Sequence, residues 1–191
     1  MDRVAAWRLT FAAVALAGCI LGPAAGAADL PSRVTIDDGK GSQVELRLQE
    51  VVEGGTLVSG FGWRREHPMG GGGASHAGID IKAPRGAPVR AAAIGTVVEV
   101  AWGPDFGRFV RIRHSSRLET IYAHLTRITR PLKIGDAVTP DDIIGQVGST
   151  GKSTGPHLHF EVRRNGAPID PLGVKPPSRK AKPAQKRGAG P

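Results

Sequence analysis

The side chains best suited to chemistry in this sequence are its six histidines. They stand at His67, His76, His114, His124, His157 and His159. An imidazole nitrogen can bind zinc, carry a proton near neutral pH, or stabilise developing negative charge. Two of the six are predicted to be incidental, because His67 follows a charged run on a loop surface and His114 ends a strand. The other four stand in distinctive local settings.

The first setting is a His-x-x-x-Asp pair formed by His76 and Asp80, two side-chain types that bind zinc. A fully extended backbone would separate their Cα atoms by ~13 Å, which is too far for joint coordination. The chain must therefore bend between them, and Gly78 permits such a bend. Taken alone, the pair is better explained by ordinary polar contacts.

The second setting is a His-x-His pair, His157 and His159, in a strand-like segment. Side chains two residues apart on a strand share a face, so both imidazoles should point one way while Leu158 and Phe160 enter the core. A bound metal would keep one ring neutral and relieve repulsion between them; the alternative is a pair of surface histidines.

A third setting is Tyr-x-His, where the same alternation predicts that Tyr122 and His124 share a face. Taken alone, His124 is better read as a half-buried, hydrogen-bonded histidine.

Taken together, the three settings predict a metal site. His76, Asp80 and one of His157 and His159 supply two nitrogens and one oxygen. Three protein ligands leave zinc a fourth position for water, which is typical of catalytic rather than structural sites. The two remaining histidines could move protons or stabilise negative charge, and the spacing leaves open which histidine does which.

The elements that must position these residues are short strands. Apolar and polar residues alternate in segments separated by turn sequences such as Pro84-Arg85-Gly86 and Arg164-Asn165-Gly166, and the chain holds 27 glycines and 15 prolines. The pattern predicts an all-β sandwich or barrel. The strands are expected at 78–81, 89–92, 96–101, 109–114, 119–124, 143–147 and 157–163.

The domain is expected to cover residues 56–172, after a lead-in segment at 29–55 with its own strand pattern. Within it, the segment from Ala83 to Val97 resembles the segment from Lys133 to Gly148. Each is a tight turn, an apolar strand and a Gly-punctuated strand, which suggests a duplicated β motif.

Residues 1–28 have the layout of a secretory signal peptide. Arg3 and Arg8 precede an apolar run from Leu9 to Leu21, and alanines at the −1 and −3 positions favour cleavage after Ala27. The run is too short for a comfortable transmembrane helix. We therefore expect export to the periplasm or cell envelope, with no transmembrane span in the mature form.

Cys19 ends a Leu-Ala-Gly-Cys tetrad that resembles the bacterial lipobox, which predicts lipid anchoring at this cysteine. The alternative, favoured by the cleavage site that follows, is that Cys19 is removed with the signal peptide. Residues 173–191 are basic, carry no acidic side chain and are rich in Pro and Gly. They are predicted to be disordered, either simply solvated or weakly attracted to anionic envelope polymers. No nucleic-acid partner is expected.

These motifs, in this order, resemble the lysostaphin-like (LytM-type) zinc metallopeptidases from about Ser59 to Leu172. The resemblance implies Zn²⁺ bound by His76, Asp80 and His159, with His157 as general base and His124 stabilising the tetrahedral intermediate. It also implies a β-sandwich of the duplicated hybrid motif type, and peptide cross-links or stems of peptidoglycan as substrate.

Three functions compete on this basis. The first is an active peptidoglycan endopeptidase, with a D,D-cross-link as preferred substrate and a glycine-rich bridge or a protein target as alternative. The second is a non-catalytic LytM-type activator or wall-binding module, against which the intact set of five polar residues argues. The third is a carrier or phosphotransfer domain: biotinyl and lipoyl carriers need a hairpin-tip lysine that is missing here, and an export signal and an Asp ligand fit a phosphotransfer protein poorly.

Overall fold

The computed structural model describes residues 29–64, 73–129 and 131–173. Several predictions lie outside these residues: the signal peptide at 1–28 with Cys19, His67, and nearly all of the basic tail. No helix in the described ranges is both long and apolar enough to cross a membrane.

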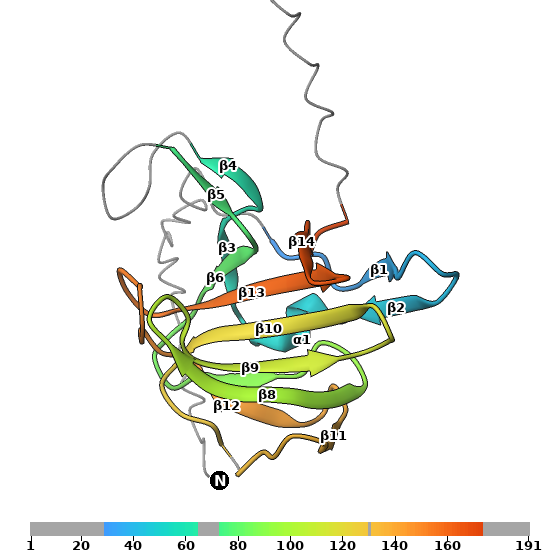
Figure 1. Ribbon diagram of the computed structural model, residues 1–191. Helices are drawn as coiled ribbons and strands as arrows, with labels where there is room; N and C mark the ends of the chain where they lie inside the picture. The colour runs from blue at the N-terminus through green and yellow to red at the C-terminus, as the bar shows by residue number, and fades with distance from the viewer. Residues whose placement is uncertain (1–28, 65–72, 130, 174–191) are drawn as a thin grey trace, which may run out of the picture.

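The described chain is nearly all β (Figure 1). The main sheet runs in the order β11-β8-β9-β10-β13-β6-β3, and β14 pairs with β13. Its strands are β3 (Thr56–Ser59), β6 (Ile79–Lys82), β8 (Gly95–Gly103), β9 (Gly107–Arg113), β10 (Leu118–Leu125), β11 (Ala137–Val138), β13 (His157–Arg164) and β14 (Ala167–Ile169).

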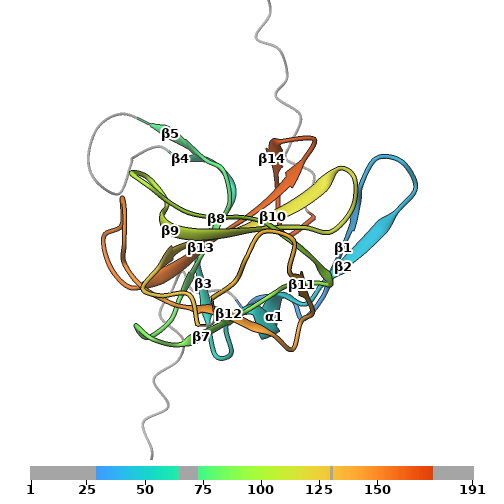
Figure 2. The ribbon, with the colours of Figure 1, turned by 60° about the horizontal axis from the view of Figure 1, so that its bottom comes forward.

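Three two-stranded sheets accompany the main sheet. They pair β1 (Val34–Asp37) with β2 (Gln43–Leu46), β4 (Gly62–Arg64) with β5 (Ala74–His76), and β7 (Pro88–Arg90) with β12 (Ile143–Gln146). The short helix α1 spans Leu48–Val51. Figure 2 shows β7, β12 and α1 beneath one face of the main sheet, so the molecule is a two-layered β-sandwich.

The core fills the space between these layers because strand alternation sends apolar side chains to that face. On β13, Leu158 and Phe160 are fully buried there, and Val89 of β7 and Ile144 of β12, on the small sheet, belong to the same core cluster. A smaller cluster around Ile121 lies apart from this core. The prediction that Leu158 and Phe160 enter the core is confirmed.

The weak internal repeat of the sequence is real in three dimensions. Gly86 N–H donates to the Val147 carbonyl at 2.8 Å, and the equivalent Gly135 N–H donates to the Val97 carbonyl at 2.8 Å. Val147 N–H donates in return to Ala87 and Val97 N–H to Asp136, at 2.9 and 2.8 Å. The turn of each copy is thus hydrogen-bonded to a strand of the other copy. This arrangement agrees with the duplicated motif that the resemblance implied.

Every strand expected from alternation is present within one or two residues of its predicted bounds. The short elements β3, β4, β5, β11, β14 and α1 were not among the elements expected from alternation. The lead-in at 29–55 forms the β1–β2 hairpin and α1, and Leu46 and Leu48 join the main core. The boundary near residue 56 therefore stays a prediction, and no separate core supports it.

His114 has a structural setting, as expected. Its half-buried ring bridges two elements: Nδ1–H donates to the Ile94 carbonyl at 2.8 Å, and Nε2 forms a 2.7 Å hydrogen bond with Thr120 Oγ1. Thr120 in turn contacts the hydroxyl of buried Tyr122, which accepts a hydrogen bond from Ala92 N–H. Desolvation lowers the pKa of His114, although the Ile94 carbonyl and Glu119 oppose the shift.

This setting predicts a pH-dependent contribution of His114 to stability. His114→Gln should lower the unfolding free energy at pH 7.5 by about 1 kcal/mol through weakened hydrogen bonds. Because the folded-state pKa is depressed, the unfolded chain takes up the proton first as pH falls, and wild type loses this contribution below about pH 6.5. In urea unfolding with chelator, the gap between the two proteins should shrink from pH 7.5 to 5.5; a constant or widening gap would contradict this account.

Candidate metal centre

The His76–Asp80 bend is made by a sharp corner between β5 and β6. His76 ends β5, and Asp80 lies inside β6, where it pairs in register with His159 of β13. Gly78 occupies the corner for lack of space: a Cβ there would lie 2.3 Å from the Phe160 carbonyl oxygen. The predicted bend at Gly78 is confirmed, and its cause is the close approach of the corner to β13.

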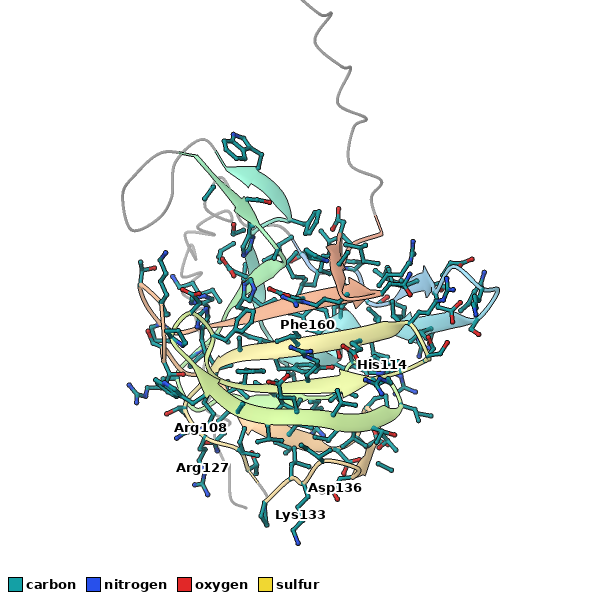
Figure 3. The ribbon with its side chains drawn as sticks, viewed as in Figure 1. Arg108, His114, Arg127, Lys133, Asp136 and Phe160 are labelled. Atoms are coloured by element: carbon teal, nitrogen blue, oxygen red, sulfur yellow. The ribbon has the colours of Figure 1, made fainter. Side chains whose placement is uncertain are left out.

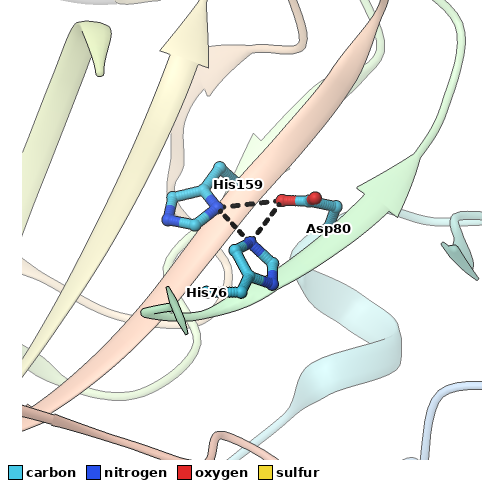
Figure 4. Close-up of side chains that lie close together, drawn as sticks. All are labelled: His76, Asp80 and His159. Atoms are coloured by element: carbon cyan, nitrogen blue, oxygen red, sulfur yellow. Dashed lines mark hydrogen bonds and ion pairs between the residues drawn. The ribbon is translucent and has the colours of Figure 1, made fainter. Parts of the chain in front are cut away.

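Three donor atoms converge at this corner (Figure 4). His76 Nε2 lies 3.1 Å from Asp80 Oδ1 and 3.1 Å from His159 Nδ1, and His159 Nδ1 lies 2.9 Å from Asp80 Oδ1. Zinc ligands at ~2.0–2.2 Å from the ion in a tetrahedron are separated by roughly 3.3–3.6 Å, so the triangle is close to the required size. The side chains of His76, Asp80 and His159 are 9%, 15% and 9% exposed.

The outer hydrogen bonds fix which ring nitrogens carry protons. His76 Nδ1 lies 2.7 Å from the Gly60 carbonyl, and His159 Nε2 lies 3.1 Å from Glu161 Oε1. Both partners are acceptors, so in neutral rings these nitrogens are the N–H donors. His76 Nε2, His159 Nδ1 and Asp80 Oδ1 then present lone pairs to one another, an arrangement that requires a cation or a proton between them.

The electrostatics of the triangle also favour positive charge. Burial opposes ionisation of Asp80, but hydrogen bonds with His159 and His76 hold the pKa of its carboxyl well below the ordinary value. Burial likewise opposes protonation of His159, yet hydrogen bonds with Asp80 and Glu161 raise its pKa. The donor set fits a divalent metal such as zinc.

Glu161 is a site residue that the sequence reasoning missed. It is 1% exposed, and its two carboxylate oxygens lie 3.1 Å from His159 Nε2 and 2.7 Å from Arg163 Nε. Burial opposes its ionisation, but the hydrogen bonds with His159 and Arg163 lower its pKa. The signal was available, because alternation along β13 places residues 157, 159, 161 and 163 on one face.

The other two histidines lie beside the triangle, and their outer nitrogens are held in the same way. His157 Nδ1 lies 2.8 Å from the Gly155 carbonyl and His124 Nδ1 lies 2.8 Å from the Thr150 carbonyl. Their ring centroids are 4.7 Å apart, and His157 Nε2 lies 3.8 Å from Asp80 Oδ1. Both rings can therefore present an Nε2 lone pair beside the donor triangle.

The prediction that Tyr122 and His124 share a face is wrong. Tyr122 is fully buried in the main core against Phe160, whereas His124 lies beside His157 and His159 on the other face. The register of β10 against β9 breaks after Tyr122, and His124 adopts a φ of 62°. This left-handed residue redirects the imidazole toward the site, which strand alternation could not anticipate.

His124 is held neutral by its surroundings. Desolvation, together with the nearby His157 and His159 rings, lowers its pKa to about 4, against the opposing effect of the Thr150 carbonyl. A neutral ring with its proton on Nδ1 can accept a proton at Nε2, and only after doing so can it donate there.

All five residues singled out in the sequence thus meet in one place. His76, Asp80 and His159 form a group that could hold a metal ion, and His124 and His157 lie next to it. The geometry selects His159 from the His-x-His pair for the triangle. Beside the triangle opens a groove of about 540 Å³ lined by Val58, Ser59, Asp80, Lys82, Thr154, Gly155, Pro156 and His157.

A β-sandwich that gathers two imidazoles and a carboxylate, flanks them with two further imidazoles and opens a groove beside them has the features of a metal-dependent hydrolase. The chain belongs to Peptidase family M23, whose model matches residues 74–171.

Similar proteins are found among curated and solved ones. "DD-carboxypeptidase/endopeptidase Mpg" of Neisseria meningitidis is 43% identical over 122 residues, covering 64% of this chain and 27% of that protein. "Peptidoglycan DD-endopeptidase ShyC" of Vibrio cholerae is 41% identical over 121 residues, covering 63% and 28%. The chain thus spans little more than a quarter of these relatives.

Two solved structures share the fold. A zinc containing peptidase from Vibrio cholerae aligns with a TM-score of 0.59 and 32% identity, over 72% of this chain and 48% of that one. The catalytic domain of lysostaphin from Staphylococcus simulans aligns with a TM-score of 0.53 and 34% identity, over 61% and 88%.

The corner geometry predicts that Gly78 is essential to the fold around the site. In Gly78→Ala, the new methyl group must displace either β13 or the β5–β6 corner, which should cost about 2 kcal/mol of unfolding free energy. Gly155→Ala is the matched control, because a Cβ there meets nothing within 4 Å, and it should change stability by less than about 0.5 kcal/mol. Equal stability of the two variants in urea unfolding would refute the steric explanation.

Proposed function

We propose that this chain is a zinc-dependent endopeptidase that hydrolyses peptide cross-links of bacterial peptidoglycan, with a D,D-cross-link as the preferred bond. The observation that carries the proposal is the convergence of three lone pairs at His76, Asp80 and His159, next to two further histidines. Family membership and relatives named as peptidoglycan DD-endopeptidases support the reaction and the substrate class.

In this proposal His76 Nε2, Asp80 Oδ1 and His159 Nδ1 hold the metal. A bound zinc ion would acidify a water molecule and polarise the scissile carbonyl. Gly60 and Glu161 orient the two imidazoles from outside by accepting their remaining N–H protons. Such outer partners fix the tautomer of a ligand histidine and hold its ring in place.

The flanking histidines handle protons. His157 is the general base. Its Nε2 offers a lone pair beside the triangle, because the Gly155 carbonyl holds the ring proton on Nδ1. His124 stabilises the negative charge that develops on the substrate. Because it is neutral in the free protein, its Nε2 becomes a donor only after taking up a proton, which the developing charge favours.

The setting of the reaction is the periplasm or cell envelope, as the signal-peptide pattern of residues 1–28 suggests. Lipid anchoring through Cys19 is the alternative to its removal, and the basic tail is proposed to have at most weak contact with anionic envelope polymers. The competing function, a non-catalytic activator, is disfavoured because all five polar side chains of the site are present and gathered together.

The ligand assignment predicts the behaviour of His76→Ala and Asp80→Ala. Each variant should lose stoichiometric zinc in equilibrium dialysis, and hydrolysis should fall by at least about 10³-fold, since the activated water depends on the ion. Lys133→Ala, at an exposed position, serves as a folded control with an unaltered donor set. Undiminished cleavage by a zinc-depleted His76→Ala protein would end the proposal.

The substrate assignment is tested on purified sacculi. Mass spectrometry of sacculi digested by the purified protein should reveal cuts in cross-linking peptides, and a chelator should abolish them until zinc is restored. Products cut in the glycan chains, or cleavage that persists with chelator, would refute the assignment.

The outer partner of His159 gives a separate prediction. Glu161→Gln keeps an acceptor for His159 Nε2–H but loses the negative charge, and Glu161→Leu loses both. Zinc affinity should therefore fall by up to about tenfold in the first variant and by about 10- to 100-fold in the second. Equal affinity of all three proteins in a competition titration would show that Glu161 has no role in metal binding.

A further inference from the structure

Among the described residues that line the groove beside the donor triangle, Lys82 is the one lysine or arginine. Lys82 follows Asp80 by two residues on β6, so the two side chains share a face, while Ile81 between them is fully buried. In the antiparallel register Lys82 pairs with His157, two residue pairs along from the Asp80–His159 pair. Lys82 is thus the next side chain on the groove floor beyond the donor triangle.

Within residues 29–64, 73–129 and 131–173, no acidic side chain forms an ion pair with Lys82. Among the residues that the structure describes, Lys82 forms no hydrogen bond or ion pair. The acidic residue in the groove lining is Asp80, whose Oδ1 faces His76 and His159. The lining residues on β3 and on the loop before β13 are neutral: Val58, Ser59, Thr154, Gly155 and Pro156.

The groove therefore combines an unpaired ammonium with a partly apolar wall. Val58 is 46% exposed, unusually open for its size, and with Pro156 it offers apolar surface beside Lys82. Two residues along a strand span ~7 Å, the same length as two residues of an extended peptide. A substrate whose scissile bond lies at the donor triangle would therefore bring a group close to the bond within reach of Lys82.

We propose that Lys82 is a specificity-determining residue that binds a free carboxylate on the substrate residue adjacent to the scissile bond. The inference rests on the proposed function and narrows its substrate class. In a cross-link from D-alanine to diaminopimelate, the carbon bearing the acylated amine also bears a carboxylate. In a cross-link to lysine the corresponding carbon bears hydrogen only. Lys82 thus selects diaminopimelate-type over lysine-type cross-links, with Val58 and Pro156 contacting the aliphatic chain.

The test compares two synthetic cross-linked peptides that differ only in whether this carboxylate is free or converted to a carboxamide. Wild type should prefer the free carboxylate by about five- to tenfold in kcat/KM, mostly through KM, because the ammonium binds substrate and transition state alike. Added salt should reduce the preference, since the ion pair is partly exposed. Lys82→Ala should remove the preference, and Lys82→Glu should reverse it.

Lys133→Ala is the matched control, because it removes the same charge from a loop at the opposite end of the molecule from β4 and β5 (Figure 3). It should keep the wild-type preference. Equal cleavage of the two peptides by wild type, or an unchanged preference in Lys82→Ala, would overturn the role of Lys82 while leaving the proposed function standing.

A binding measurement separates the two proposals if neither peptide is cleaved. Calorimetry with the zinc-loaded protein and the diaminopimelate-containing product peptide, free or amidated, should show the same five- to tenfold difference in Kd, lost in Lys82→Ala. Such a difference without turnover would count against the proposed hydrolysis and for the carboxylate site; no difference would count against Lys82.

Discussion

The proposed chemistry depends on mutual repulsion among three donor atoms that the fold brings together. His76, Asp80 and His159 bring three lone pairs to within about 3 Å of one another in a largely buried position, which is unfavourable unless a positive charge lies between them. The conflict is built in, because Gly60 and Glu161 hold the two ring protons on the outer nitrogens. Hydrogen bonds with His159 and Arg163 in turn lower the pKa of Glu161, against the effect of burial. A divalent cation would resolve the conflict, and the three donors lie close enough together to hold one.

The duplicated sandwich makes this placement rigid. The two halves are joined by reciprocal backbone hydrogen bonds at Gly86 and Gly135. Buried side chains of β6, β10 and β13 pack into the core between the layers. Asp80 and His159 lie on adjacent paired strands, so their separation is fixed by the sheet rather than by a loop. Donor positions fixed by strands are held more closely than those on loops, which suits a site whose donor atoms repel one another.

Sequence patterns predicted the parts of this arrangement that follow from local periodicity. Alternation placed His157 and His159 on one face and located every long strand, and the need to bend between His76 and Asp80 pointed to Gly78. The alternation rule failed at His124, where a register break and a left-handed backbone conformation turn the side chain to the opposite face from Tyr122. The choice of His159 over His157 for the triangle depends on pairing between β6 and β13, a contact between residues 79 positions apart. The same alternation along β13 places Glu161 on the face of His157 and His159, so its position beside His159 could have been predicted from the sequence. The β4–β5 hairpin carries too few alternating residues to be recognised.

The protonation pattern of the histidine rings tests the central claim most directly. Long-range ¹H–¹⁵N correlation NMR of the metal-free protein at neutral pH reports which nitrogen of each ring carries the proton. Protons on Nδ1 of His76 and Nε2 of His159 are expected, with His76 Nε2 and His159 Nδ1 shifting together on addition of one equivalent of zinc. A neutral ring whose single proton lies on Nε2 of His76 or on Nδ1 of His159, or resonances of both rings that ignore zinc, would contradict the account.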